Sequence, residues 1–297
     1  MAHSKSGGTR AYIRGKIGAD VYSIGKNGKG QKQQVVRSLA EQVSNPQTEA
    51  QMRGRMIMST IMQAQSAMRA IVDHSFDGVP SGMPSLAHFT ATNYALVKAD
   101  VAAHPASGNK FGLNKYQAKG LMQGKYVISD GKLEDPILVS ASVTNNIASV
   151  VIASNGGSVT AGSVREALGL SVGDYFTICL VVDTIDGGNA FTFARFRLTD
   201  TLAASTTITD SNVASLFDVE SYVPADATIT FADGNITITW STYSASQVAV
   251  IYSKKEGDTW VHNKAQLTSV TNPDYAADDA LPTYPQGAGR FINGGEL

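Results

Sequence analysis

The segment TITFADGNITITW, residues 228–240, decides the fold class, because it has the pattern of two short strands joined by a tight turn. Isoleucines and Phe231 alternate with threonines on either side of Asp233-Gly234. Such alternation is typical of a strand with one buried and one solvated face, and Asp-Gly favours the two-residue turn of a hairpin. The segment therefore predicts an antiparallel sheet.

Similar apolar and β-branched runs recur through the second half of the chain, separated by Gly, Asn and Asp. Their spacing of roughly 8–12 residues is typical of a sandwich or barrel. We expect a β-sandwich-like domain over residues 125–277, with a hairpin turn at Asp130-Gly131 and short helices at 163–168 and 212–217. The expected strands cover residues 125–129, 137–143, 147–153, 174–183, 190–199, 227–232, 235–240, 247–253 and 258–262.

Helical periodicity marks the segment that precedes these strands. Asn45 is a suitable N-cap and Pro46 suits the first helical position, so we expect a helix from there to about His74. A second helix is expected over about 84–103, within a helical segment of residues 45–124. The chain is thus predicted to be α+β. Apolar residues near the helical period form one stripe on the first helix: Met52, Met56, Ile57, Ile61, Ala64, Met68, Ile71 and Val72.

Met58 and Met62 lie beside that stripe and widen the apolar surface of the first helix. Methionine is flexible and adapts to irregular partner surfaces. We expect Ile57 and Ile61 to face the protein's own core, and Met58 or Met62 to approach a neighbouring chain. Ordinary core packing of the methionines is the alternative.

The first 44 residues form a basic segment with few large apolar residues, and we expect an extended arm. Residues 1–37 hold eight Lys/Arg and one acidic residue, a net charge of +7. Residues 138–297 hold seven Lys/Arg and sixteen acidic residues, a net charge of −9. The two charges could attract each other between copies, or the arm could face phosphate.

Short strand-like patches in this arm favour docking on a neighbouring subunit, where they would complete a sheet. The residues 26–30, with Asn27-Gly28 at their centre, are expected to form a turn between two of these strands. Binding of phosphate by the cations, with Tyr22 stacking on bases, is a rival interpretation, and simple disorder is a third. The candidate arm residues are Arg10, Arg14, Lys16, Tyr22, Lys26, Lys29, Lys32 and Arg37.

No catalytic or metal-binding motif stands out. The five histidines form no H-x-H or H-E-x-x-H pattern, and neither a P-loop nor a G-x-S-x-G elbow is present. The single cysteine, Cys179, lies in an apolar run and is expected to be a buried core residue. We expect no enzymatic activity, cofactor, metal or small-molecule substrate. No apolar run reaches the roughly 18 residues of a membrane span, so we expect synthesis in a cytoplasm and no membrane partner.

Several of these stretches resemble structural proteins of tailed phages that infect gut bacteria, including the crAss-like group. The resemblance covers about a third of the chain, including the stretch from Val248–Ser253 through Trp260 and the ending 291–297. The motifs are Gly-x-Ile-Gly, Val-Arg-Ser and Asn-Pro-x-Thr-x-x-Gln-x-x-x-Arg. They match at Gly15, Ile17, Gly18, Val36, Arg37, Ser38, Asn45, Pro46, Thr48, Gln51 and Arg55.

The resemblance implies a virion protein with a swapped N-terminal arm, placed in a ring or connector of the head–tail or tail assembly. Its partners would be copies of itself and other virion proteins, and it carries over no active site. One alternative is a nucleic-acid-binding protein packaged with the genome, although we expect only weak binding. A weaker alternative is a host-surface-binding β module, which exposed aromatic side chains would favour. Trp240 and Trp260 fall in expected strands, and we expect both in the core. The tail at 278–297 is expected to be extended.

Overall fold

The computed structural model describes residues 3–4, 13–26, 28–38, 49–103, 125–153, 158–183, 189–222 and 226–268. The chain divides into two compact units, Met1–Thr48 and Glu49–Leu297. The fold is α+β with mostly antiparallel sheet, as the sequence predicts. The N-cap expected at Asn45 and the tail at 278–297 lie outside the described residues.

The first unit holds one antiparallel sheet in the order β1-β2-β3-β4. Its strands are β1 (His3–Ser4), β2 (Ile13–Ile17), β3 (Asp20–Lys26) and β4 (Lys32–Ser38). The turn between β2 and β3 contains Gly18 at φ 59°, a left-handed conformation that glycine adopts without strain. The strand and turn pattern predicted for residues 26–30 is confirmed, since β3 pairs with β4 across it. Whether residues 1–44 as a whole form an extended arm stays a prediction.

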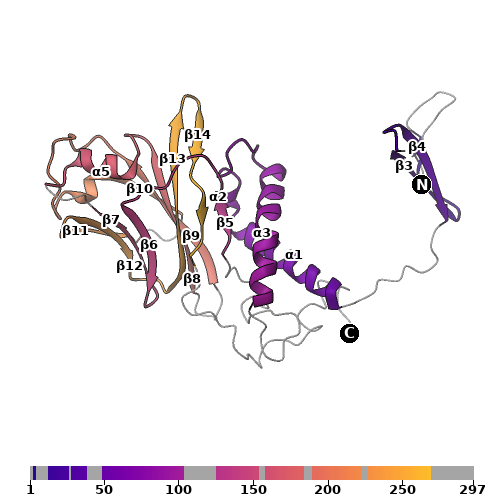
Figure 1. The fold of residues 1–297 in the computed structure, drawn as a ribbon, viewed down its shortest axis with the longest axis horizontal. Helices are drawn as coiled ribbons and strands as arrows, with labels where there is room; N and C mark the ends of the chain where they lie inside the picture. The colour runs from indigo at the N-terminus through magenta and orange to yellow at the C-terminus, as the bar shows by residue number, and fades with distance from the viewer. Residues whose placement is uncertain are drawn as a thin grey trace. The chain divides into compact units, whose positions relative to one another are not determined.

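The second unit is built on a five-stranded sheet in the order β10-β9-β8-β13-β14. One face of this central sheet packs on a four-stranded sheet of order β11-β12-β7-β6, as Figure 1 shows. The two inner faces share one core, in which Phe196 and Trp240 are almost fully buried. The central strands are β8 (Tyr175–Asp183), β9 (Asn189–Leu198), β10 (Phe217–Tyr222), β13 (Ala245–Glu256) and β14 (Thr259–His262). The second sheet comprises β6 (Val139–Thr144), β7 (Ile147–Ile152), β11 (Thr228–Ala232) and β12 (Asn235–Trp240).

The opposite face of the central sheet is covered by a helical layer (Figure 1). The layer contains α1 (Glu49–Ala67), α2 (Arg69–Val72), α3 (Met83–Ala103) and the strand pair of β5 (Val127–Ser129) and β15 (Ala265–Gln266). Its side chains form a second core with Cys179 and Val181 of β8 and Ala249 of β13. The central sheet is therefore covered on both faces, which explains why seven consecutive residues of β8 are buried.

A buried asparagine attaches α3 to β5. The side-chain amide of Asn93 donates to the Val127 carbonyl at 2.9 Å, and its oxygen accepts the Val127 N–H at 2.7 Å. Both main-chain groups of Val127 are thus satisfied by one side chain, much as a neighbouring strand would satisfy them. This pairing is what allows a helix to cover the outer side of a short strand.

Two expectations from the sequence are wrong, and two short helices are confirmed. Asp130-Gly131 does not turn a hairpin, because β5 pairs with β15, far along the chain. The short helix expected at 212–217 is the 3-10 helix η1 (Val213–Leu216), and the strand β10 follows it. The first helix ends at Ala67, and Met68 separates it from α2. The helix at 163–168 is confirmed as α5 (Ala161–Leu168), with a capping box between Thr160 and Ser163.

Candidate functional site

The N-terminal sheet has two chemically different faces, which follow from its register. Tyr22 is paired with Gly15 and Val36, and Val21 with Lys16 and Arg37. Because paired residues of an antiparallel sheet point to the same side, one face carries more of the large apolar side chains and the other more of the strand arginines. The apolar face comprises Ile17, Tyr22, Ile24 and Val36, with the charged Asp20, Lys26 and Lys32 at its ends. The basic face comprises Arg14, Lys16 and Arg37, and it also carries Val21 and Val35.

The apolar face lacks a covering layer among the described residues of its own unit. Ile17 is 48% exposed and Val36 is 50% exposed. Ile17 ends β2 and Val36 lies on the outer strand β4, whereas Tyr22 and Ile24 of the inner strand β3 are half-buried. Large apolar side chains of a sheet are normally packed against a second layer. The predicted arm residues lie on β2 (Arg14, Lys16), on β3 (Tyr22, Lys26), in the following turn (Lys29) and on β4 (Lys32, Arg37), whereas Arg10 lies outside the described residues.

The first helix separates its faces as the sequence predicts. Ile57 and Ile61 are 2% and 0% exposed and belong to the second core. Met58 and Met62 are 37% and 59% exposed. They line a shallow groove of about 760 Å³ together with Gly54, Arg55, Ser59, Gln63, Ser66 and Tyr94. Contact of either methionine with a neighbouring chain stays a prediction.

A partly exposed cluster of aromatic and arginine side chains lies on the central sheet. It includes Trp260, for which the predicted core position is wrong. Trp240 is 1% exposed, as expected, but Trp260 is 39% exposed. The Trp260 ring lies 5.2 Å from the ring of Tyr175 between centroids. The guanidinium carbons of Arg195 and Arg197 lie 5.6 Å and 6.0 Å from the centre of the same Tyr175 ring. These side chains share the face that the helical layer covers further along the strands.

A buried carboxylate joins the helical layer to the sheets. Asp77, just after α2, accepts a hydrogen bond from His262 Nδ1 at 2.9 Å and from the Lys132 N–H at 3.1 Å. Its side chain and that of His262 are 14% and 13% exposed. An Asp–His pair is also part of hydrolase triads. The two buried serines of this junction, Ser75 and Ser129, donate to backbone carbonyls, so neither hydroxyl is placed as a nucleophile for the pair.

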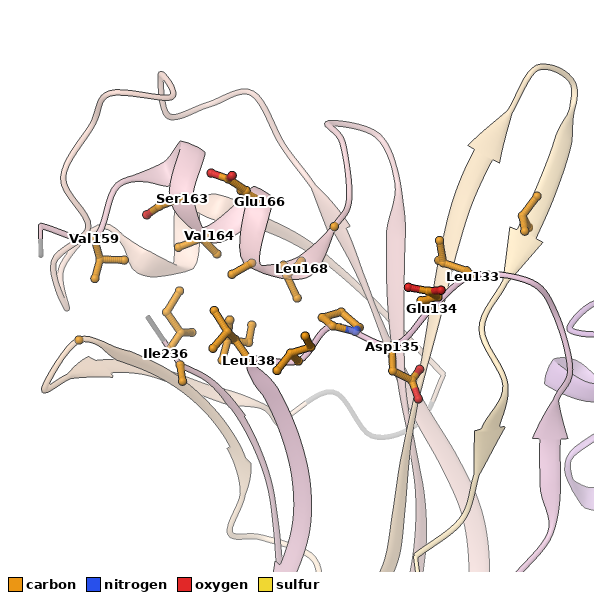
Figure 2. A pocket seen from close by; sticks show the side chains of 18 of the residues that line it. Leu133, Glu134, Asp135, Leu138, Val159, Ser163, Val164, Glu166, Leu168 and Ile236 are labelled. Atoms are coloured by element: carbon orange, nitrogen blue, oxygen red, sulfur yellow. The ribbon is translucent and has the colours of Figure 1, made fainter. Parts of the chain in front are cut away.

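A cavity of about 970 Å³ lies between α5 and the segment 132–138. Figure 2 shows Val164 and Leu168 pointing from α5 toward Leu138 and Ile236, so the facing side chains are apolar. Among the carboxylates around the cavity, Glu166 lies on the other side of α5 in Figure 2, and Asp135 accepts a hydrogen bond from the Asn263 amide. Lys132, Glu134 and Glu256 also line the cavity, so its wall is apolar between α5 and Leu138 and polar elsewhere.

The described residues carry little reactive chemistry. Cys179 is fully buried, as predicted, and burial raises the pKa of its thiol while the charge of Arg195 opposes the shift. A raised pKa keeps the thiol protonated and unreactive. Within the described ranges, His, Cys, Asp and Glu do not gather in a group that could hold a metal ion. In the same part of the chain, none of the helices is long and apolar enough to cross a membrane.

Comparison of this chain with family models, curated proteins and solved structures found no match.

Proposed function

We propose that this chain is a non-enzymatic structural protein of a phage virion, a ring or connector component of the head–tail or tail assembly. In this proposal the N-terminal sheet docks on neighbouring copies and other virion proteins are further partners. The observation that carries the proposal is the N-terminal sheet itself, whose apolar face exposes half of Val36 and nearly half of Ile17. A sheet of this kind gains its missing layer or strand from another chain.

The experiment is to measure the mass of the full chain and of a variant without residues 1–44 in solution. We expect the full chain to form an oligomer and the truncated chain to form a smaller species. The far-ultraviolet circular dichroism spectrum of the truncated chain should still be that of a folded, β-rich protein. An oligomer of the same copy number after truncation would overturn the proposal, because assembly would then not depend on the N-terminal sheet.

A second candidate is a nucleic-acid-binding protein, which the basic face of Arg14, Lys16 and Arg37 favours. Phosphate contacts make log affinity fall with log salt by about 0.9 per contact for duplex DNA. We expect weak DNA binding that disappears near ~0.15 M salt. Tight binding at that salt, lost on replacing Lys26, Lys29, Lys32 and Arg37 by Gln, would favour this candidate over assembly.

A third candidate is a host-surface-binding β module, and the exposed Trp260 beside Tyr175 is the observation that favours it. Aromatic rings presented on a sheet suit the apolar faces of sugars as well as protein side chains. Glycan-array binding by the full chain that is lost in Trp260→Ala, with the oligomer unchanged, would support this candidate.

A further inference from the structure

Among the described residues, β10 is the outer strand of the central sheet and has a neighbouring strand, β9, on one side only. Its residues alternate: Phe217 and Val219 are paired with Leu198 and Phe196 on the core face, whereas Asp218 and Glu220 point to the other face. Val219 is 40% exposed, although its face is the core face of the sheet. An open edge of this kind presents main-chain N–H and C=O groups to any strand that can add to it.

Within the described part of the first unit, β4 is likewise an outer strand, with β3 on one side only. Its residues alternate in the same way, with the exposed Val36 on the apolar face and Arg37 on the basic face. Both edge strands therefore carry an exposed valine next to a charged residue, and the two charges are opposite. The opposite charges are therefore found on the two edge strands themselves, and not only in the net charges of the two ends of the chain.

The surrounding charges extend the complementarity. Residues 198–253 contain six acidic residues and no Lys, Arg or His, whereas residues 13–38 contain six Lys/Arg and one acidic residue. Among the described outer strands of the two sandwich sheets, β10 is the one with carboxylates inside the strand. The sequences of the others are TWVH in β14, TITFA in β11 and VSASVT in β6. Asp218 and Glu220 lie opposite Arg197 and Arg195 of β9, which offset part of their charge. Among the four edges, β10 is still the one that offers a basic strand carboxylates, and an added β4 would place Arg37 on the free side of Asp218.

We propose that β4 of one copy adds to the free edge of β10 in a second copy, so that the N-terminal sheet continues the central sheet of its neighbour. This inference rests on the proposed function, and it names the site where the N-terminal sheet docks. The antiparallel register with Val36 opposite Val219 places Arg37 opposite Asp218. It continues the apolar face of the N-terminal sheet along the inner side of the sandwich. A slip by one residue would place Arg37 beside Val219 and is therefore disfavoured.

The register can be tested by cross-linking, because the only native cysteine, Cys179, is buried. Chains with Val36→Cys and chains with Val219→Cys are mixed and oxidised, and each variant is oxidised alone as a control. We expect disulfide-linked dimers in the mixture and only a background level in either control. Dimers formed equally by one variant alone, or an intrachain link in the double variant without dimers in the mixture, would overturn the inference.

Charge reversal gives a second test that tolerates small changes of geometry. We expect Arg37→Glu to weaken the self-association at least about tenfold, and Asp218→Arg in the same chain to restore it, because the pair is then reversed. Asp258→Arg, at the exposed β13–β14 turn, is the matched control and should not restore association. Rescue by Asp258→Arg as well, or unchanged association in Arg37→Glu, would overturn the inference.

The two proposals fail differently. If removal of residues 1–44 reduces the oligomer but neither the cross-link nor the charge rescue is observed, docking on β10 is wrong and assembly through the N-terminal sheet stands. If the truncation leaves the oligomer unchanged, both proposals are wrong.

Discussion

The N-terminal sheet and the central sheet are both antiparallel, yet among the described residues of each unit only the central sheet has layers that cover it. In the central sheet Ile178 and Cys179, on opposite faces of β8, are both fully buried. In the N-terminal sheet Ile17 is nearly half exposed. Strand pairing alone does not exclude water from side chains, so a single sheet gains little hydrophobic stabilisation until a second layer is present. The central sheet obtains its layers within the chain, and we propose that the N-terminal sheet relies on another copy.

The largest expected effect contrasts the two sheets through one substitution. Ile178→Ala should lower the free energy of unfolding of residues 49–297 by about 2–5 kcal/mol, because it leaves a cavity between packed layers. Ile17→Ala should change the stability of the N-terminal sheet by less than about 0.5 kcal/mol, as is usual for exposed positions. Both tryptophans lie in the second unit, so urea unfolding followed by their fluorescence measures the effect of Ile178→Ala, and amide hydrogen exchange in β2, β3 and β4 measures that of Ile17→Ala. Similar losses for both variants would mean that the N-terminal sheet is covered in the isolated chain.

The next effect concerns the way in which the helical layer is attached to the sheets. Asn93→Ala removes the amide that pairs with both main-chain groups of Val127, so a buried N–H and a buried C=O lose their partner. We expect a loss of about 2–3 kcal/mol in the free energy of unfolding.

Thr90→Ala on the same helix is the control, since the Thr90 hydroxyl donates to the Leu86 carbonyl of its own helix. It should cost less than about 1 kcal/mol. Equal losses in the two variants would show that β5 does not depend on Asn93.

Much of the covered region could be predicted from sequence because its signals are local. The hairpin of residues 228–240 and the helix at 83–103 depend on alternation and turn residues within the segment. The partner of β5 could not be predicted, because Val127 and Gln266 are brought together by the tertiary fold. β10 was missed because Asp218 and Glu220 make its outward face charged, which is common on an edge strand and weak as a strand signal.

The candidate site is harder to predict than the fold. Period-2 alternation assigns Trp260 to one face of β14, but its exposure depends on how far the helical layer extends over that face. In the N-terminal sheet, the sequence identifies the cations but not which of them share a side. The register of β2, β3 and β4 decides that Arg14, Lys16 and Arg37 do. A charged surface therefore needs the strand pairing before it can be interpreted.

Alkaline pH should have a smaller effect on the free energy of unfolding, and this effect comes from a residue buried in the central sheet. Burial raises the pKa of Cys179, so its thiol stays protonated in the folded chain while the unfolded chain ionises near pH 8.5. The unfolded state then binds fewer protons, and stability falls as pH rises above about 8.5, by up to about 1.4 kcal/mol per pH unit. Burial also raises the pKa of Tyr252, whose contribution would begin near pH 10.

Urea unfolding between pH 8 and 9.5 therefore isolates the thiol. Cys179→Ala should remove most of the slope over this interval, even though its stability at pH 7 is lower. A slope that is the same in both chains would exclude Cys179 as its source.

The smallest expected effect on stability concerns α1, where a covered and an uncovered face belong to one helix. Met62→Asp should change the free energy of unfolding by less than about 0.5 kcal/mol, because Met62 is 59% exposed, and Met58→Asp should have a similarly small effect. If Met58 or Met62 meets a neighbouring chain, the carboxylate would be desolvated there without a partner, and the oligomer should dissociate at a higher protein concentration than the native chain.

Ile61→Ala on the buried face is the control: it should cost about 2–5 kcal/mol of stability and leave the assembly of the folded chain intact. Normal assembly of both aspartate variants would mean that the groove around Met58 and Met62 stays exposed to solvent in the oligomer. Unfolding of either variant would mean that its methionine belongs to the core.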